Sequence, residues 1–311
     1  MGGAKSENRY TEWLRYVNGH VELLQLGKAI PAVGEAAGPP LIPASAPAER
    51  AFRVVLCSPH PDDEALTGAL PLRLRLELGA KVTNCAITLG SDVNRREGRR
   101  RELESACRVL GFEIAIPQEP GGFESVSVKT RTERPDAWAA MLGALAKVFE
   151  RLQPDVVFAP HAEDWHPAHI GTHFLAVDAL AAYSVQAKQE AVPLIETCYW
   201  HEHAQPNLMV GVAPETLATL VMATAEHAGE VSRNAYHLRL PSRMIENVRR
   251  GAETVGRVGG AAPDFPFAEL YRVTFMKGKQ QLSPRAEGRI VGPDEKTDWA
   301  AVLDEFRPRE R

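Results

Sequence analysis

The stretch FRVVLCSPHPDDEA, residues 52–65, joins an apolar run to a histidine, two prolines and three consecutive acids. An apolar run of this length predicts a β-strand. Three adjacent carboxylates repel one another, so folding stability alone gives little reason to place them together. A bound divalent cation would make the arrangement favourable, because histidine nitrogen and aspartate oxygen are zinc ligands. The stretch therefore predicts a metal site at the end of a strand.

Strands and helices are predicted to alternate along the rest of the chain. This alternation favours an α/β, Rossmann-like fold, in which a mostly parallel sheet is flanked by helices on both faces. The helix that follows the opening stretch is expected to break or restart at Pro71. We expect strands at 52–57, 81–89, 112–117, 155–160 and within 193–203, and helices at 65–79, 95–111, 136–154 and 169–187.

The chain is predicted to have three parts. Residues 1–50 contain an amphipathic helix at 8–27, ended by Gly27, and a Pro/Ala-rich connector at 31–50. Residues 51–277 are expected to form the main domain, and residues 278–311 a charged C-terminal tail that is loose or wrapped on the surface. The first helix lies outside the core domain, so the chain is a possible homo-oligomer in which that helix packs on a neighbouring subunit.

Charge and hydropathy argue against several classes of partner. The formal net charge is −4, which leaves no excess of cations for the phosphates of a nucleic acid. No apolar run approaches the roughly 20 residues that span a bilayer, and no secretory signal is recognisable. The four cysteines, none in a CxxC pair, are expected to be buried reduced thiols. These features predict a cytoplasmic protein without nucleic-acid or membrane partners.

Three polar clusters follow predicted strands: SPHPDDE at 58–64, GSDVNRRE at 90–97 and PHAEDWHPAH at 160–169. In open α/β sheets, ligands bind outside the carboxyl ends of the strands, so these clusters are expected to meet at one edge. A lone histidine is usually structural, but the last cluster and the residues after it contain four. Two adjacent carboxylates rarely flank a glycosidic bond from opposite sides, which disfavours a glycosidase. The candidate metal-binding or catalytic side chains are His60, Asp62, Asp63, His161, Asp164, His166, His169 and His173.

The pairing of PHPDDE with DWHPAH about a hundred residues later resembles the PIG-L/LmbE family of metal-dependent N-deacetylases. Further resemblance lies in an Arg-x-x-Glu-x-x-x-Ala helix at Arg99, Glu102 and Ala106, and it extends more weakly to residue 275. The resemblance implies a hydrolase that removes acetyl groups from N-acetylglucosamine-like sugars or related amides. By position it implies metal ligands His60, Asp63 and His169, a general base Asp62, an oxyanion-stabilising His166, and substrate contacts from Arg99 and Asp164.

The second motif departs from the family pattern at Ala168, because the family commonly has His-Pro-Asp-His where this chain has HPAH. Without that carboxylate, the pKa of the neighbouring histidine is expected to fall, unless Asp164 or another acid takes its place. Glu64 is expected to turn inward and support the loop. Residues 227–250 are interpreted either as a solvated helix and loop or as a substrate-facing lid with Arg233, His237 and Arg243.

These observations predict a zinc-dependent N-deacetylase, with another divalent metal possible, acting on a small N-acetylated molecule that is a sugar or sugar conjugate. The alternative is a non-catalytic sugar- or metal-binding protein derived from such an enzyme. The presence of both Asp62 and Asp63 disfavours that alternative, since a binding module needs no second carboxylate. A phosphate-binding Rossmann protein is disfavoured by the absence of GxGxxG and GxxxxGK[ST].

Overall fold

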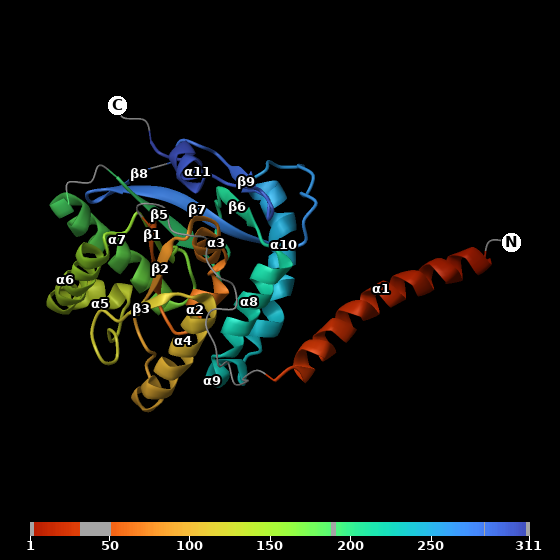
Figure 1. The fold of residues 1–311 in the computed structure, drawn as a ribbon, viewed down its shortest axis with the longest axis horizontal. Helices are drawn as coiled ribbons and strands as arrows, with labels where there is room; N and C mark the ends of the chain where they lie inside the picture. Colours follow the sequence, from red (N-terminus) through yellow and green to blue (C-terminus); the bar gives the residue numbers. More distant parts are fainter. Residues whose placement is uncertain (1–2, 32–50, 188–190, 283, 309–311) are drawn as a thin grey trace.

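A computed structural model describes residues 3–31, 51–187, 191–282 and 284–308 (Figure 1). Its strands form a nine-stranded sheet in the order β3-β2-β1-β4-β5-β7-β6-β9, with β8 paired to β7. The strands are β1 (Arg53–Ser58), β2 (Lys81–Ala86), β3 (Glu113–Ala115), β4 (Val156–Pro160), β5 (Val192–Thr197), β6 (Leu208–Gly211), β7 (Ala268–Lys277), β8 (Gln280–Leu282) and β9 (Arg289–Val291).

Helices cover both faces of this sheet, as Figure 1 shows. One face packs against α3, α4, α8, α10 and α11, and the other against α6 and α7. The helices are α1 (Gly3–Ala29), α2 (Asp63–Leu66), α3 (Ala69–Leu78), η1 (Val93–Arg95), α4 (Arg96–Leu110), α5 (Val128–Glu133), α6 (Pro135–Leu152), α7 (Pro167–Ala187), α8 (Pro214–Ala225), α9 (Ala228–Val231), α10 (Tyr236–Thr254) and α11 (Trp299–Glu305).

The first five strands are parallel, and β7 joins them antiparallel to β5. The register places Val54, Val55 and Leu56 of β1 beside residues of both β2 and β4. Successive side chains of a strand point to opposite faces, and both faces are covered, which explains why residues 54–57 of β1 are all apolar. Val54 and Leu56 enter one core and Val55 and Cys57 the other. The predicted Rossmann-like, mostly parallel fold is confirmed.

The helix after β1 is interrupted earlier than predicted. It divides at Thr67 and Gly68 into α2 and α3, and Pro71 is the third residue of α3. Proline is tolerated in the first turn of a helix because its missing N–H would have no partner there. The break leaves α2 as a single short turn, which carries Asp63 and Glu64 and is directly preceded by Asp62.

The C-terminal residues differ from the expected loose tail. Their described part contains β8, β9 and α11, and β9 extends the sheet by pairing with β6. Trp299 and Phe306 are fully buried, so α11 completes the core rather than lying loosely on the surface. The segment is rich in charged residues, but its few apolar residues at helical spacing are enough to bury one side of α11 against the core. The division into three parts itself stays a prediction.

The N-terminal helix α1 projects away from the body, and its C-terminal end lies against α10 (Figure 1). The helix is confirmed, but it continues past Gly27 to Ala29. The predicted connector falls at residues 32–50, outside the described residues. Within the described parts of the chain, no helix combines the length and the apolar character needed to cross a bilayer.

Candidate metal centre and active site

The loops after β1, β2 and β4 meet at the carboxyl edge of the sheet, as their order along the chain predicts. There they border a cavity of about 620 Å³. The cavity is also bordered by residues 123–127 and by the segment from Glu230 to Tyr236. Among the predicted site residues, those that line it are His60, Asp62, Arg99 and His166.

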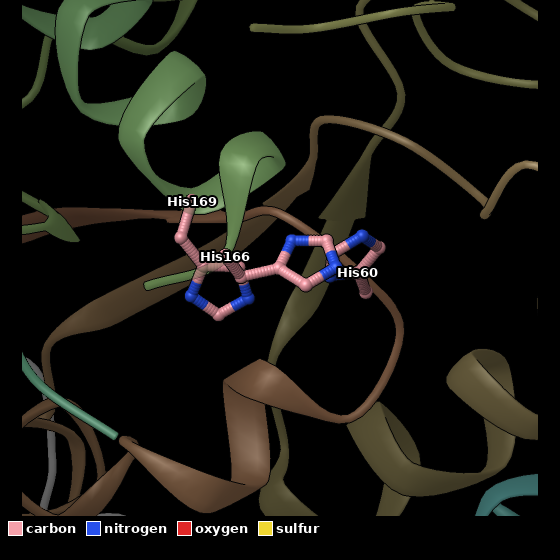
Figure 2. Close-up of side chains that lie close together, drawn as sticks. All are labelled: His60, His166 and His169. Atoms are coloured by element: carbon pink, nitrogen blue, oxygen red, sulfur yellow. The ribbon is translucent and has the colours of Figure 1, made fainter. Parts of the chain in front are cut away.

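Three histidines gather at this cavity: His60 and His166 line it, and His169 is buried close to both. His60, His166 and His169 each offer a nitrogen, and these atoms all lie within 4.8 Å of one another. Figure 2 shows the three rings turned toward a common space, with His60 on the loop after β1 and His169 in the first turn of α7. The two motifs are thus two halves of one site.

Asp63 belongs to the same group. Its Oδ2 accepts a hydrogen bond from the His60 backbone N–H at 2.9 Å, and it lies 3.6 Å from His60 Nδ1 and 3.4 Å from His169 Nε2. Burial alone would raise the pKa of Asp63, but the neighbouring His169 and His60 lower it to about 2. The carboxylate is therefore charged at neutral pH, as a metal ligand must be.

The surroundings of His169 fit a bound cation. Its Nε2 is buried without a hydrogen-bond partner among the described residues, and its Nδ1 lies 3.4 Å from Asp164 Oδ2. A carboxylate on the far nitrogen of a ligating histidine commonly fixes its tautomer and orientation. Burial alone would lower the pKa of His169, yet the Asp63 and Asp164 carboxylates raise it. This environment favours positive charge, and a divalent ion would satisfy it in place of a proton.

Asp62 is buried but reaches the cavity. Burial raises the pKa of its carboxyl well above the usual range, and the charge of Asp63 raises it further. Its backbone has φ of 123°, a left-handed value that non-glycine residues rarely adopt. The two adjacent acids therefore differ: Asp63 holds its charge, whereas Asp62 has an increased affinity for a proton.

His166 is exposed to the cavity, and its ring lacks a carboxylate partner. Its Nδ1 accepts a hydrogen bond from the Ala168 backbone N–H at 3.2 Å, so the neutral ring carries its proton on Nε2. Within the described residues no carboxylate oxygen lies within 4 Å of its ring nitrogens, and Asp164 instead accepts from the His166 backbone N–H. Partial burial and the neighbouring His60 and His169 lower the pKa of His166. The effect of Ala168 on this pKa stays a prediction, because burial and the two histidine neighbours account for the lowering.

The two residues predicted to contact substrate are placed differently. Arg99 lines the cavity, donates from Nη2 to the Pro61 carbonyl at 3.0 Å, and lies 3.6 Å from Glu230. Asp164 is buried, and its side chain contacts His169 and the His166 backbone rather than the cavity.

Other cavity residues were not predicted. Trp200 and Tyr236 form an edge-to-face pair with ring centroids 5.6 Å apart, and Glu230 joins Arg95, Arg99 and Arg233. Trp200 follows β5 and Tyr236 begins α10, so no local sequence pattern connects either of them to the motifs. Arg233 of the suggested lid borders the cavity, whereas Arg243 lies deeper and donates to the Cys198 carbonyl.

Residues 55–180 match the family model described as GlcNAc-PI de-N-acetylase (PIG-L). This match confirms the resemblance to the PIG-L/LmbE family. The deacetylase of 1D-myo-inositol 2-acetamido-2-deoxy-alpha-D-glucopyranoside from Mycobacterium leprae is 28% identical over 163 residues, which are 44% of this chain and 53% of that protein. The chain thus spans about half the length of the curated relatives that it matches.

Solved structures share the fold. A conserved protein of Thermus thermophilus aligns over 70% of this chain and 93% of its own, with 21% identity and a TM-score of 0.53. The N,N'-diacetylchitobiose deacetylase of Pyrococcus horikoshii aligns over 74% and 85%, with 18% identity and a TM-score of 0.50. The 4-carboxy-2-hydroxymuconate hydratase of Pseudomonas putida aligns over 71% and 95%, with 18% identity and a TM-score of 0.51. Because a hydratase has this fold too, the reaction must be argued from the site.

Proposed function

We propose that this chain is a metal-dependent hydrolase that removes an acetyl or other acyl group from the amide nitrogen of an N-acetylglucosamine-like sugar or a related small molecule. The observation that carries the proposal is the placing of two unlike carboxylates, Asp62 and Asp63, beside the His60, His166 and His169 rings at one cavity. The matched family model and the deacetylase of Mycobacterium leprae support the same chemistry.

His60, Asp63 and His169 would hold the metal, which we propose to be zinc, with another divalent ion as an alternative. In that position the ion would polarise the amide carbonyl and lower the pKa of water toward about 7. Asp164 would orient His169 through its Nδ1 atom. By distance, His166 could replace Asp63 as the third metal ligand. Its exposure to the cavity instead favours contact with the substrate.

Asp62 would take a proton from the attacking water, a role that suits its raised pKa and that contributes roughly 10²–10⁴-fold to a rate. The Nε2–H of His166 would donate to the oxygen that becomes negative when water adds to the carbonyl, an effect of about 3–4 kcal/mol for one donor. The C–N bond then breaks, and the amine leaves with a proton from Asp62 or His166. The products are a free carboxylate, acetate for an acetyl group, and a free amine.

Measuring both metal content and acetate release on the same variants distinguishes the general base from the metal ligands. Asp62→Asn should keep one ion per chain and lose turnover by roughly 100-fold or more. Asp63→Ala and His169→Ala should lose the ion, whereas His166→Ala should keep it and lose turnover. A His166→Ala protein without metal would transfer His166 to the ligand set, and near wild-type turnover of Asp62→Asn would remove the base assignment.

The competing function is a sugar- or metal-binding protein without catalysis. Metal analysis followed by an acetate assay on N-acetylglucosamine, N-acetylglucosaminyl-inositol and N,N'-diacetylchitobiose discriminates between the two. One ion per chain with no acetate released from any substrate would favour binding alone.

A further inference from the structure

The backbone conformation of Asp62 is energetically unfavourable, so contacts with neighbouring groups must stabilise it. Its φ of 123° and ψ of −30° lie outside the regions that suit residues with a Cβ atom, and such a backbone costs on the order of 1–3 kcal/mol. It persists only where neighbouring groups over-determine it. Hydrogen bonds to the N–H and the carbonyl of Asp62 are the contacts that can hold it.

Glu64 fixes the N–H side of Asp62. The Glu64 side chain is fully buried and turns back toward its own loop, where Oε2 accepts a hydrogen bond from the Asp62 backbone N–H at 3.0 Å. On the other side, the Asp62 carbonyl accepts from the N–H groups of Ala65 and Leu66 at 3.1 and 3.0 Å. Both backbone polar groups of Asp62 are therefore engaged within the loop, and its carboxyl is left to face the cavity.

His227 in turn fixes Glu64. It lies between α8 and α9, 163 residues further along the chain, and its Nε2 lies 2.6 Å from Glu64 Oε1. Both side chains are fully buried, where a charge-assisted hydrogen bond is strong. The Nδ1 of His227 has no hydrogen-bond partner among the described residues. Burying that nitrogen is unfavourable, so packing alone does not explain a histidine here.

We propose that Glu64 and His227 are a positioning pair that holds the Asp62 backbone in its left-handed conformation and so aims the Asp62 carboxyl into the cavity. The pair touches no reacting atom and acts only through Asp62. As a role in catalysis it rests on the proposed function, because Asp62 is the base there. That the pair holds the Asp62 backbone follows from the observed contacts and does not depend on the proposed function.

The kinetic test replaces the pair by leucines, E64L/H227L. A buried ion pair is often replaced by apolar residues without loss of stability, so this protein should fold and bind metal. Its kcat should fall roughly 10- to 100-fold, since small misplacements of a catalytic group are costly, while KM stays within about twofold. Glu64→Gln, whose amide oxygen can still accept from Asp62, should recover most of the kcat. Wild-type kcat in E64L/H227L would overturn the catalytic role.

A control removes a partly exposed ion pair that does not line the cavity. Arg131 and Asp178 pair at 2.9 Å between α5 and α7. R131L/D178L should lose stability and keep kcat, which shows that the loss in E64L/H227L is not a general effect of deleting a pair. If E64L/H227L does not fold, Glu64→Met replaces it, because it removes the acceptor of the Asp62 N–H and changes one side chain only.

A second measurement needs no activity. At a left-handed φ, glycine is favoured over alanine by about 1–2 kcal/mol, so Asp62→Gly should melt roughly 2 °C or more above Asp62→Ala. In the E64L/H227L background this difference should vanish or reverse, because the released loop can adopt a negative φ. An unchanged difference would show that the pair does not hold the backbone. If the wild-type protein releases no acetate at all, the proposed function fails, and the melting comparison still decides the positioning role.

Discussion

At the scale of single residues, three consecutive acids meet three different surroundings. Asp63 faces His60 and His169 and is charged, Asp62 faces the cavity with a raised pKa, and Glu64 turns inward to His227. Their mutual repulsion is offset because each has its own neighbours. The prediction that Glu64 turns inward is confirmed.

Restoring the carboxylate that the family commonly has at residue 168 tests the role of His166. Ala168→Asp should leave the metal content unchanged, because residue 168 is not one of the proposed ligands and its backbone N–H donates to His166. An anion beside the ring raises the pKa of His166 from its lowered value, so the limb of the pH–rate profile that reports His166 should move upward by about one unit.

The neutral variant Ala168→Asn is the control for this experiment, since it has nearly the same shape and no charge. It should leave the kcat/KM profile where the wild-type protein has it. Identical profiles for the Asp and Asn variants would show that His166 does not limit the rate.

At the scale of elements, α1 is unlike the other helices. Its apolar side chains remain exposed along its length, including Trp13, Tyr16, Val17 and Leu23. At 100° per residue these four positions fall within an arc of about 120°, but Leu14 and Leu26 are also exposed and lie to either side of that arc, so a single contact with α10 cannot bury them all. The sequence pattern predicts the helix correctly, and the fold provides no surface of its own to cover it.

Deleting residues 1–30 is expected to lower the mass of the protein in solution if α1 packs on a second copy of the chain. The melting temperature at low protein concentration should change little, because α1 adds no side chain to the described cores. Light scattering after size-exclusion chromatography measures the mass. Equal mass and equal stability for the full and shortened chains would remove α1 as an assembly element.

At the scale of the whole molecule, a buried polar network ties together elements that are distant in sequence. Glu269 on β7 accepts hydrogen bonds from the Ala69 backbone N–H at the start of α3 and from the Tyr271 hydroxyl, at 3.1 and 2.6 Å. Arg243 on α10 lies 3.9 Å away. Burial raises the pKa of Glu269 to about 7, against the opposing effect of the Arg243 cation.

The raised pKa of Glu269 makes stability depend on pH. The folded protein binds this proton more tightly than the unfolded chain, so its contribution is fully present below the unfolded pKa near 4.5 and is lost as pH rises through about 7. Relative to Glu269→Gln, the wild-type free energy of unfolding should fall by about 3 kcal/mol between pH 4.5 and 7.5.

Denaturant unfolding of both proteins at several pH values checks this prediction, and contributions common to both proteins cancel in the difference. Glu215→Gln, at an exposed position of α8, controls for the loss of a carboxylate and is measured at the same pH values. A difference between the wild-type protein and Glu269→Gln that does not change with pH would contradict the raised pKa of Glu269.

The sequence by itself determined the parallel core and the two halves of the site. The apolar runs after residue 51 are long enough to specify strands, and the motifs are local, so their residue types and order predict one sheet edge. Strand β6 and the buried helix α11 escaped prediction, because their short apolar runs resemble surface segments until the rest of the core is present. Strand β7 also escaped prediction, because the polar residues Glu269 and Thr274 interrupt its apolar pattern although the fold buries them.

Only the tertiary structure decided which surroundings each residue of the candidate site has. The left-handed backbone of Asp62, the contact of Asp164 with His169, the Trp200–Tyr236 wall and the Glu64–His227 pair all depend on groups from separate parts of the fold. Residue types and their spacing show which reactions a segment could take part in. Burial and the charges of distant neighbours set pKa and orientation, and those are fixed only when the chain has folded.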